Sequence, residues 1–247
     1  MAIDISEPIL THLSYFSVGS TKRVEGAGSA IIGSGTLVSI GGRRGILTCG
    51  HVAEIYKKLA DIGMVRFSKV GNQNRIVKLD EAQTIILVSS PEWSETDLDL
   101  AFTMLPTAIT ESIAAQAIFV NMEMNKAKMQ SGEPDGAHST DAMLGLIAEF
   151  SGKPFIEGQE YISPMRGVLH TGNAVTQGNG LLTIKPKAYN MDKLPHSFGG
   201  MSGAGTWRLH FAESEAGPTI LRYTLIGVAS WEEQGNQGGR MSGLGPD

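Results

Sequence analysis

Glycine interrupts this chain about once in every eight residues, and this frequency constrains the fold more than any other feature. Of the 247 residues, 31 are glycine, against a usual share of roughly 7%. The glycines follow no Gly-X-Y period and hydrophobic residues make up 41% of the chain, so the composition fits neither collagen nor a disordered linker. The glycines therefore indicate a globular fold with many turns and close backbone approaches.

Short apolar runs separated by Gly, Ser and Asn are typical of an all-β protein. In the first half of the chain, strands are expected at 30–32, 35–40, 45–48, 64–68, 75–78, 84–88 and 98–104. In the second half they are expected at 143–148, 167–170, 181–185, 205–209 and 223–230. Apolar spacing predicts one short helix at 52–61, and the Gly-rich tail, 235–247, is expected to be frayed.

A change of amino-acid composition near the middle divides the chain. Residues 107–127 are rich in Ala, Met, Glu and Lys, and the polar stretch that follows contains Gly and Pro. We interpret 107–140 as a connecting segment between an N-terminal β unit, 1–106, and a C-terminal β unit, 141–247.

Charge and composition exclude several classes of protein. The net charge of −5 argues against a nucleic-acid partner, and no apolar run approaches the roughly 18 residues of a membrane span. Lone Cys49 excludes an internal disulfide framework and a Cys-rich zinc site. No phosphate-binding Gly-Lys-Ser/Thr motif occurs. We expect no metal, no cofactor and no membrane contact. Without disulfides or a signal peptide, a cytoplasmic location is expected.

Three segments could carry chemistry. An apolar strand from Gly45 ends in small residues and then presents His51; the alternative is a structural histidine at a strand end. Strand alternation places Asp97 and Asp99 on one face; the alternative is a solvated edge. Ser202 stands among closely spaced glycines, which suits a strained turn whose amides converge on one spot; the alternative is an ordinary Gly-rich turn.

The order His, Asp, Ser is that of chymotrypsin-type proteases, and the sequence resembles the trypsin-like family over most of its length. The segment 46–52, Ile-Leu-Thr-Cys-Gly-His-Val, resembles the family's Leu-Thr-Ala-Ala/Gly-His-Val. Asp99-Leu-Ala resembles Asp-Ile/Leu-Ala, Gly200-Met-Ser-Gly resembles Gly-Asp-Ser-Gly, and 225–231 resembles the strand that ends in Ser-Trp. Two other families with this triad fit less well. An α/β-hydrolase would need an acid and then a His after the Ser, and only His210 follows Ser202 here. A subtilisin would need the Asp before the His, and here Asp99 follows His51.

The resemblance implies a fold and a reaction. The fold would be all-β, with two antiparallel six-stranded Greek-key barrels of the chymotrypsin type. His51 and Asp99 would come from the first barrel and Ser202 from the second. Ser202 would be the nucleophile, His51 the base, and Asp99 the group that orients it, with Asp97 as the second choice. The amides of Gly200 and Ser202 would form the oxyanion hole.

The same resemblance implies where a protein or peptide substrate would bind. A substrate strand would lie along Ser230, Trp231 and Glu232, with His196 and Ser197 near the base of the primary pocket. Trp231 could instead be a core residue, and specificity stays open.

Met201 departs from the family pattern, because it stands where secreted members carry the Asp that pairs with a newly cleaved N-terminus. We hypothesise activation without that salt bridge, with activity gated by a regulatory protein partner. A catalytically silent, protease-like peptide-binding module is the alternative function.

Overall fold

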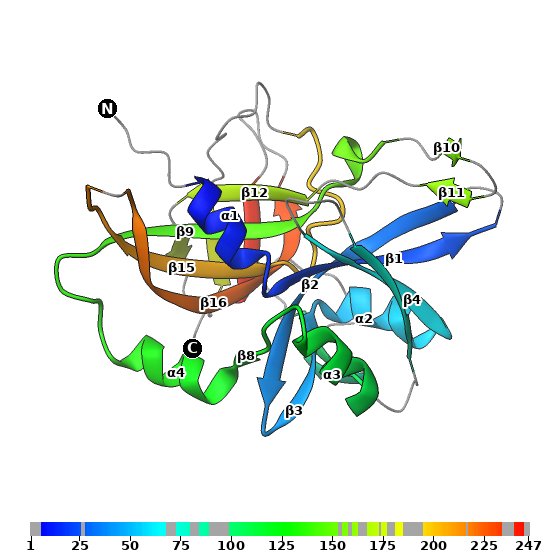
Figure 1. Ribbon diagram of the computed structural model, residues 1–247, viewed down its shortest axis with the longest axis horizontal. Coiled ribbons are helices and arrows are strands. Elements are labelled where there is room, and N and C mark those ends of the chain that lie inside the picture. Colours follow the sequence, from blue (N-terminus) through cyan, green and yellow to red (C-terminus); the bar gives the residue numbers. More distant parts are fainter. Residues whose placement is uncertain are drawn as a thin grey trace.

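Two antiparallel sheets dominate the structure, and the helices pack beside them (Figure 1). The computed structural model describes residues 6–25, 28–67, 73–79, 84–88, 99–152, 155–157, 160–162, 167–172, 174–176, 181–184, 195–215, 217–233 and 240–244. The expectation of an all-β fold is confirmed. None of the helices in these ranges is long and apolar enough to cross a bilayer.

The first sheet and the elements around it come from the first half of the chain. They are α1 (Ser6–Leu13), β1 (Ser17–Val24), β2 (Gly28–Ile40), β3 (Arg43–Thr48), α2 (Gly50–Lys57), β4 (Asp61–Arg66), β5 (Gln73–Lys78), β6 (Thr84–Val88), β7 (Leu100–Met104), α3 (Thr107–Ala114), β8 (Val120–Asn121) and α4 (Met122–Gln130).

The second sheet and the short elements beside it follow. They are β9 (His138–Leu146), η2 (Ala148–Phe150), β10 (Phe155–Glu157), β11 (Glu160–Ile162), β12 (Gly167–Gly172), β13 (Ala174–Thr176), β14 (Leu181–Ile184), β15 (Gly205–Ala212), β16 (Thr219–Glu233) and β17 (Arg240–Leu244).

The first sheet is curled. Its strand order is β5-β4-β1-β2-β3-β7-β6, with β8 paired to β2 outside this path. The end strands β5 and β6 are consecutive in the chain, and only residues 79–83 separate them. A link of this length spans at most about 22 Å, whereas a flat sheet of this order would place its ends about 29 Å apart, so the two ends approach each other. The antiparallel pairings give β5 and β6 the same direction, and we count them as one interrupted strand, which leaves six strand positions.

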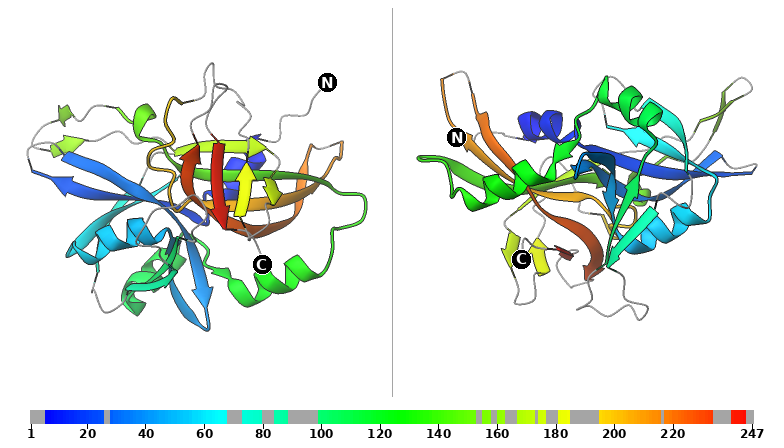
Figure 2. Two further views of the ribbon diagram at one scale, coloured as in Figure 1. Left: turned by 180° about the vertical axis from the view of Figure 1, so that it is seen from behind. Right: turned by 90° about the horizontal axis from the view of Figure 1, so that it is seen from below.

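The second sheet is built in the same way. Its order is β12-β9-β15-β16-β17-β14-β13, and one residue separates the end strands β12 and β13. The Asp141 carboxylate of β9 accepts a hydrogen bond of 2.6 Å from the Ala174 amide at the start of β13. When each interrupted strand is treated as one, both sheets have the same cyclic order. Figure 2 shows the second sheet from behind, with β16, β17, β14 and β13 in succession.

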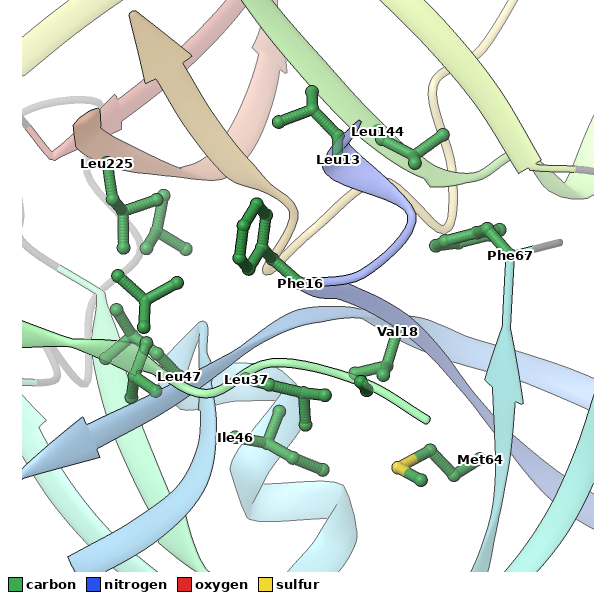
Figure 3. Close-up of a cluster of buried hydrophobic side chains, with 14 of the residues drawn as sticks. Leu13, Phe16, Val18, Leu37, Ile46, Leu47, Met64, Phe67, Leu144 and Leu225 are labelled. Atoms are coloured by element: carbon green, nitrogen blue, oxygen red, sulfur yellow. The ribbon is translucent and has the colours of Figure 1, made fainter. Parts of the chain in front are cut away.

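One continuous apolar core joins the two sheets (Figure 3). It contains Leu37 of the first sheet and Leu144 of the second, both fully buried. Phe16, in the turn after α1, packs between them, with its ring centroid 5.1 Å from that of Trp207. Cys49 is a free, buried thiol. Apolar burial, and not a disulfide, therefore holds the two sheets together.

Helix α4 is fastened to the second sheet by one buried amide. Asn125 is 3% exposed. Its side chain donates to the Leu225 carbonyl and accepts from the Leu225 amide, both at 2.9 Å. These two bonds satisfy the backbone amide and carbonyl of Leu225, as a neighbouring strand would. The segment that connects the two sheets is therefore hydrogen-bonded to β16.

Several local expectations differ from the structure. Strand β1 and helix α1 were not expected, and β2 runs continuously through two expected strands, 30–32 and 35–40. Helix α2 begins at Gly50 and not at Val52. The tail is not wholly frayed, because 240–244 forms β17, which pairs with both β16 and β14. Pairing with partners far away in the chain orders this Gly-rich segment.

His12 on α1 gives the fold a pH dependence that can be measured. Its Nε2 is buried without a hydrogen-bond partner among the described residues, and its ring lies 4.5 Å from that of Tyr223. Burial, and secondarily Lys128, lower the pKa of His12. The unfolded chain, with a His pKa near 6.5, therefore takes up this proton before the folded chain does. Stability is complete above that pH and declines as the pH falls below it.

We expect His12→Phe to remove part of this loss while it preserves the ring contacts. The measurement is urea unfolding of both proteins at pH 7, 6 and 5. His210, whose pKa burial also lowers, is present in both, so the difference isolates His12. Parallel stability curves for the two proteins would contradict the assignment.

Candidate active site

Two neighbouring strands of the first sheet bring His51 and Asp99 together. In the register of β3 and β7, Thr48 lies opposite Ala101. If this antiparallel register is extended by two residues beyond the paired strands, Asp99 lies opposite Gly50, the residue before His51. The sequence could suggest a pair here only by its resemblance, because the two residues are 48 positions apart. The runner-up acid, Asp97, lies outside the described residues.

The Asp99 carboxylate holds His51 by both its backbone and its ring. One carboxylate oxygen accepts from the His51 amide at 3.1 Å. The other lies 2.5 Å from His51 Nδ1. Since His51 is the second residue of α2, the first bond also satisfies an amide that the helix start leaves without a partner. A carboxylate only accepts, so the ring proton is assigned to Nδ1, and Nε2 is left as the basic nitrogen.

The loop that carries Ser202, residues 198–204, is held by hydrogen bonds to its carbonyl oxygens. The Gly199 carbonyl accepts from the Ala148 amide at 2.8 Å. The Gly200 carbonyl accepts from the Ser34 hydroxyl at 2.7 Å, and the Ser202 carbonyl from the Ser34 amide at 2.7 Å. The loop backbone is therefore fixed from two sides, by the start of η2 and by β2.

Two amides of this loop remain available for a ligand. In a planar trans peptide the N–H points away from the C=O, so the Gly200 N–H points away from Ala148. Within the described part of the chain, neither the Gly200 nor the Ser202 amide donates a hydrogen bond. Gly200 has a φ of +99°, which favours glycine. These two amides are the ones that the sequence suggested for an oxyanion hole.

A shared acceptor places the Ser202 loop against the His51 segment. The Ala229 carbonyl of β16 accepts from the Gly203 amide at 2.7 Å and from the Cys49 thiol at 2.8 Å. Ser202 immediately precedes Gly203, and His51 lies two residues after Cys49. The Ser202 hydroxyl itself makes no hydrogen bond to a described residue, His51 included.

The expected substrate-binding residues lie at several places around this centre. His196 and Ser197 are exposed. The Ser197 amide donates to the Glu149 carboxylate at 3.0 Å, and its hydroxyl accepts from the Gly199 amide at 3.1 Å. Ser230 is 7% exposed on β16.

The backbones of Trp231 and Glu232 lie opposite Ser242 and Met241 of β17. The side chains of Trp231 and Glu232 lie outside the described residues.

Met201 is an apolar anchor of the loop. Its side chain is completely buried and belongs to a second apolar cluster, which includes Phe198, Ala204 and Ala229. A Cβ on Gly145 would lie 2.6 Å from Met201 Sδ, so the sulfur is closely packed. No buried charge has to be paired at this position.

Cys49, His51 and Asp99 are also the one group in the described ranges with the residue types of a metal site, and their ligand atoms lie within 4.8 Å of one another. Cys49 is fully buried, and this burial, with the nearby Asp99 charge, raises the pKa of its thiol well above the usual value. A metal binds the thiolate, whereas this thiol is protonated and donates to Ala229. The protonated, buried thiol therefore fits a structural hydrogen-bond donor better than a metal ligand, and His51 and Asp99 are left as an imidazole and the carboxylate that orients it.

The sequence interpretation missed two residues of this centre, Ser34 and Thr48. The Thr48 hydroxyl donates to the Ser34 carbonyl at 2.7 Å, and Ser34 in turn holds the 198–204 loop. Ser34 lies between two glycines, a pattern that predicts a turn and not a continuous strand. No stronger signal marks it in the sequence, because β2 also contains Ser29, Thr36 and Ser39.

Comparisons with known proteins give remote similarities to solved structures. No family model matches the chain, and no curated protein matches it. A chain in a solved structure matches with a TM-score of 0.47 and 16% sequence identity, over 94% of this chain and 85% of the other. That structure is described as "Aromatic interactions drive the coupled folding and binding of the intrinsically disordered Sesbania mosaic virus VPg protein".

Replacement of Gly203 by Ala tests the close packing of this centre. Gly203 has a φ of +92°, and a Cβ there would overlap the Ser34 carbonyl oxygen and Thr48 Oγ1. We expect Gly203→Ala to lower the free energy of unfolding by about 3 kcal/mol or more. Gly217 is the matched control, since it has a φ of +107° and no neighbour within 4 Å of its Cβ position.

Gly217→Ala should cost only the backbone strain, about 1–2 kcal/mol. Chemical denaturation of both variants measures the difference. Equal losses would show that the contacts of Gly203 are unimportant.

Proposed function

We propose that this chain is a serine endopeptidase that hydrolyses peptide bonds in proteins through an acyl-enzyme intermediate. One observation carries the proposal. The Asp99 carboxylate holds both the amide and Nδ1 of His51, next to a loop that presents Ser202 and two amides with no hydrogen-bond acceptor in the described ranges. This is the arrangement that acyl transfer requires: an oriented base, a nucleophile and donors for the developing oxyanion.

The proposed reaction uses these groups in turn. Ser202 Oγ attacks the scissile carbonyl carbon while His51 Nε2 takes its proton. The Gly200 and Ser202 amides donate to the oxyanion, each contributing about 3–4 kcal/mol to the transition state. The C–N bond then breaks, and His51 passes the proton to the leaving amine. Water, deprotonated by His51, attacks the acyl-enzyme, and Ser202 regains its proton as the acid leaves. Asp99 stabilises the imidazolium in both halves.

Strand β16 supports a peptide substrate for this reaction. Its residues Trp231 and Glu232 pair with β17 on one edge. On the opposite edge no described strand pairs with these two residues, because the pairing with β15 ends at Val228. An extended peptide can add to such an edge through backbone hydrogen bonds. The neighbouring Ala229 accepts from Gly203, so a peptide on this edge would lie next to Ser202.

Activation would not require a new N-terminus. Met201 packs in an apolar cluster at the position where secreted members of the trypsin-like family carry an Asp. Gating by a regulatory protein partner is part of the proposal, and robust turnover of generic peptides by the isolated chain would argue against it.

The alternative function is a catalytically silent module that binds peptides. It is favoured by the Ser202 hydroxyl, which has no hydrogen-bond partner among the described residues. In free enzymes, however, the nucleophile-to-base bond is often long and shortens when substrate binds.

Covalent labelling distinguishes the two functions. We expect a fluorophosphonate probe to label the wild-type chain and Ser202→Ala to remain unlabelled, because the probe needs an activated serine. Ser214→Ala, which changes an exposed serine elsewhere, should be labelled like the wild type. Intact-protein mass spectrometry gives the measurement. Folded wild type that resists labelling, with and without candidate partners, would favour the silent module.

The role of Asp99 predicts a large kinetic effect without unfolding. We expect Asp99→Asn to lower kcat about 10⁴-fold, because an amide can stabilise the wrong tautomer of His51 and cannot balance its charge. Asp61→Asn, at an exposed position on β4, should leave kcat unchanged.

Steady-state hydrolysis of a peptide by the wild type and both variants tests this point. A fully active Asp99→Asn protein would exclude this triad.

A further inference from the structure

Ser34 is a polar residue at a completely buried position between the two sheets. Its relative exposure is 0%, and burial of a hydroxyl is costly unless the group is hydrogen-bonded. It lies on β2 opposite Gly19 of β1. The pairing of β2 with β3 begins only at Thr36, so the other edge of Ser34 is available to the 198–204 loop.

Every hydrogen-bonding group of Ser34 has a partner in the proposed active site. Its amide donates to the Ser202 carbonyl at 2.7 Å, and its carbonyl accepts from the Thr48 hydroxyl at 2.7 Å. Its hydroxyl lies 2.7 Å from the Gly200 carbonyl and 2.9 Å from the Leu146 amide. Because Leu146 supplies its own proton, the hydroxyl proton of Ser34 belongs to the bond with Gly200.

This bond fixes a peptide that would otherwise rotate easily. Gly199 and Gly200 are consecutive glycines, which adopt many backbone conformations. Ala148 fixes the peptide before Gly200 through the Gly199 carbonyl, and Ser34 fixes the peptide after it. Without the Ser34 bond, the described residues would hold the second peptide only through the Met201 amide, which donates to the Phe198 carbonyl at 2.9 Å. The Gly200 Cα joins the two peptides, so a shift of the second peptide would move the Gly200 amide relative to the oxyanion.

We propose that Ser34 is a positioning residue for the oxyanion hole: its hydroxyl holds the Gly200 carbonyl so that the Gly200 and Ser202 amides face the substrate. The inference rests on the proposed peptidase function and names a residue that acts on the same site from the other sheet. Ser34 touches neither the substrate edge of β16 nor His51, so it acts only through the loop.

Ser20 provides a matched control. It is a buried serine on β1, 1% exposed, and its hydroxyl donates to the Gly33 carbonyl at 3.0 Å. Ser20→Ala and Ser34→Ala therefore each remove one buried hydroxyl that bonds to backbone. The Ser20 hydroxyl bonds within the first sheet, whereas the Ser34 hydroxyl bonds to the loop and to Leu146 of the second sheet. Of the two, only Ser34 bonds to the 198–204 loop.

The kinetic test compares kcat, KM and thermal unfolding of wild type, Ser20→Ala and Ser34→Ala. We expect Ser34→Ala to lower kcat by about tenfold to a hundredfold, as a small misplacement of a catalytic group does, with KM within about twofold. Ser20→Ala should keep kcat, and both variants should unfold at similar temperatures. Ser34→Cys, which keeps a weak donor, should lie between wild type and Ser34→Ala, and it provides the test if Ser34→Ala does not fold.

A second measurement does not depend on activity. Amide hydrogen exchange at Met201 and Ala204, whose amides bond within the loop, should be about tenfold faster in Ser34→Ala and unchanged in Ser20→Ala. If wild type shows no turnover but exchange rises in this way, the peptidase proposal fails and the restraint by Ser34 stands. If wild type is active and Ser34→Ala matches it in kcat and in exchange, the inference is overturned while the function stands. A kcat loss in Ser34→Ala no larger than in Ser20→Ala would overturn it as well.

Discussion

The hydrogen bonds between β2 and the 198–204 loop are the junction on which the proposed active site depends. Ser34 donates to two carbonyls of the loop, from its amide and from its hydroxyl. The Thr48 hydroxyl donates to Ser34 from the strand that leads to His51. The base and the nucleophile come from different sheets, so their relative position is only as well defined as this junction. Buried bonds of this kind are costly to break, because each leaves an unsatisfied polar group.

Apolar packing supports this junction from both sides, without a disulfide. The core that surrounds Phe16 contains side chains from both sheets (Figure 3), and α1 contributes Leu13 to it. A second apolar cluster holds Met201 directly beneath the loop. A buried ion pair at the position of Met201 would carry a desolvation cost, whereas a thioether carries none. Apolar packing therefore adds to the hydrogen bonds that hold the loop, without a buried ion pair.

Sequence patterns predicted the regular parts of the fold better than the junctions between them. Strand β6 lies where its β-branched run predicts it, and β7 begins two residues later than expected. Strand β1 has a small and polar sequence, so periodicity gives no signal for it; its pairing with β2 and β4 forms it. Strand β17 likewise depends on pairing with β14 and β16. The common strand order of the two sheets has no counterpart in the sequence, since pairing order is not encoded by local residue types.

The residue types and their order along the chain were enough to nominate His51, Asp99, Ser202 and the glycines beside the serine. Local chemistry suggested each of them separately, through small residues before a histidine, an acid at a strand end and a serine in a glycine turn. Their order along the chain and the resemblance joined them into one site. Only the tertiary structure decided that Asp99 also binds the His51 backbone, that the Gly200 and Ser202 amides lack partners among the described residues, and that Ser34 holds the loop. Those facts depend on contacts between segments up to 168 positions apart, and strand pairing and core packing, not local sequence, determine such contacts.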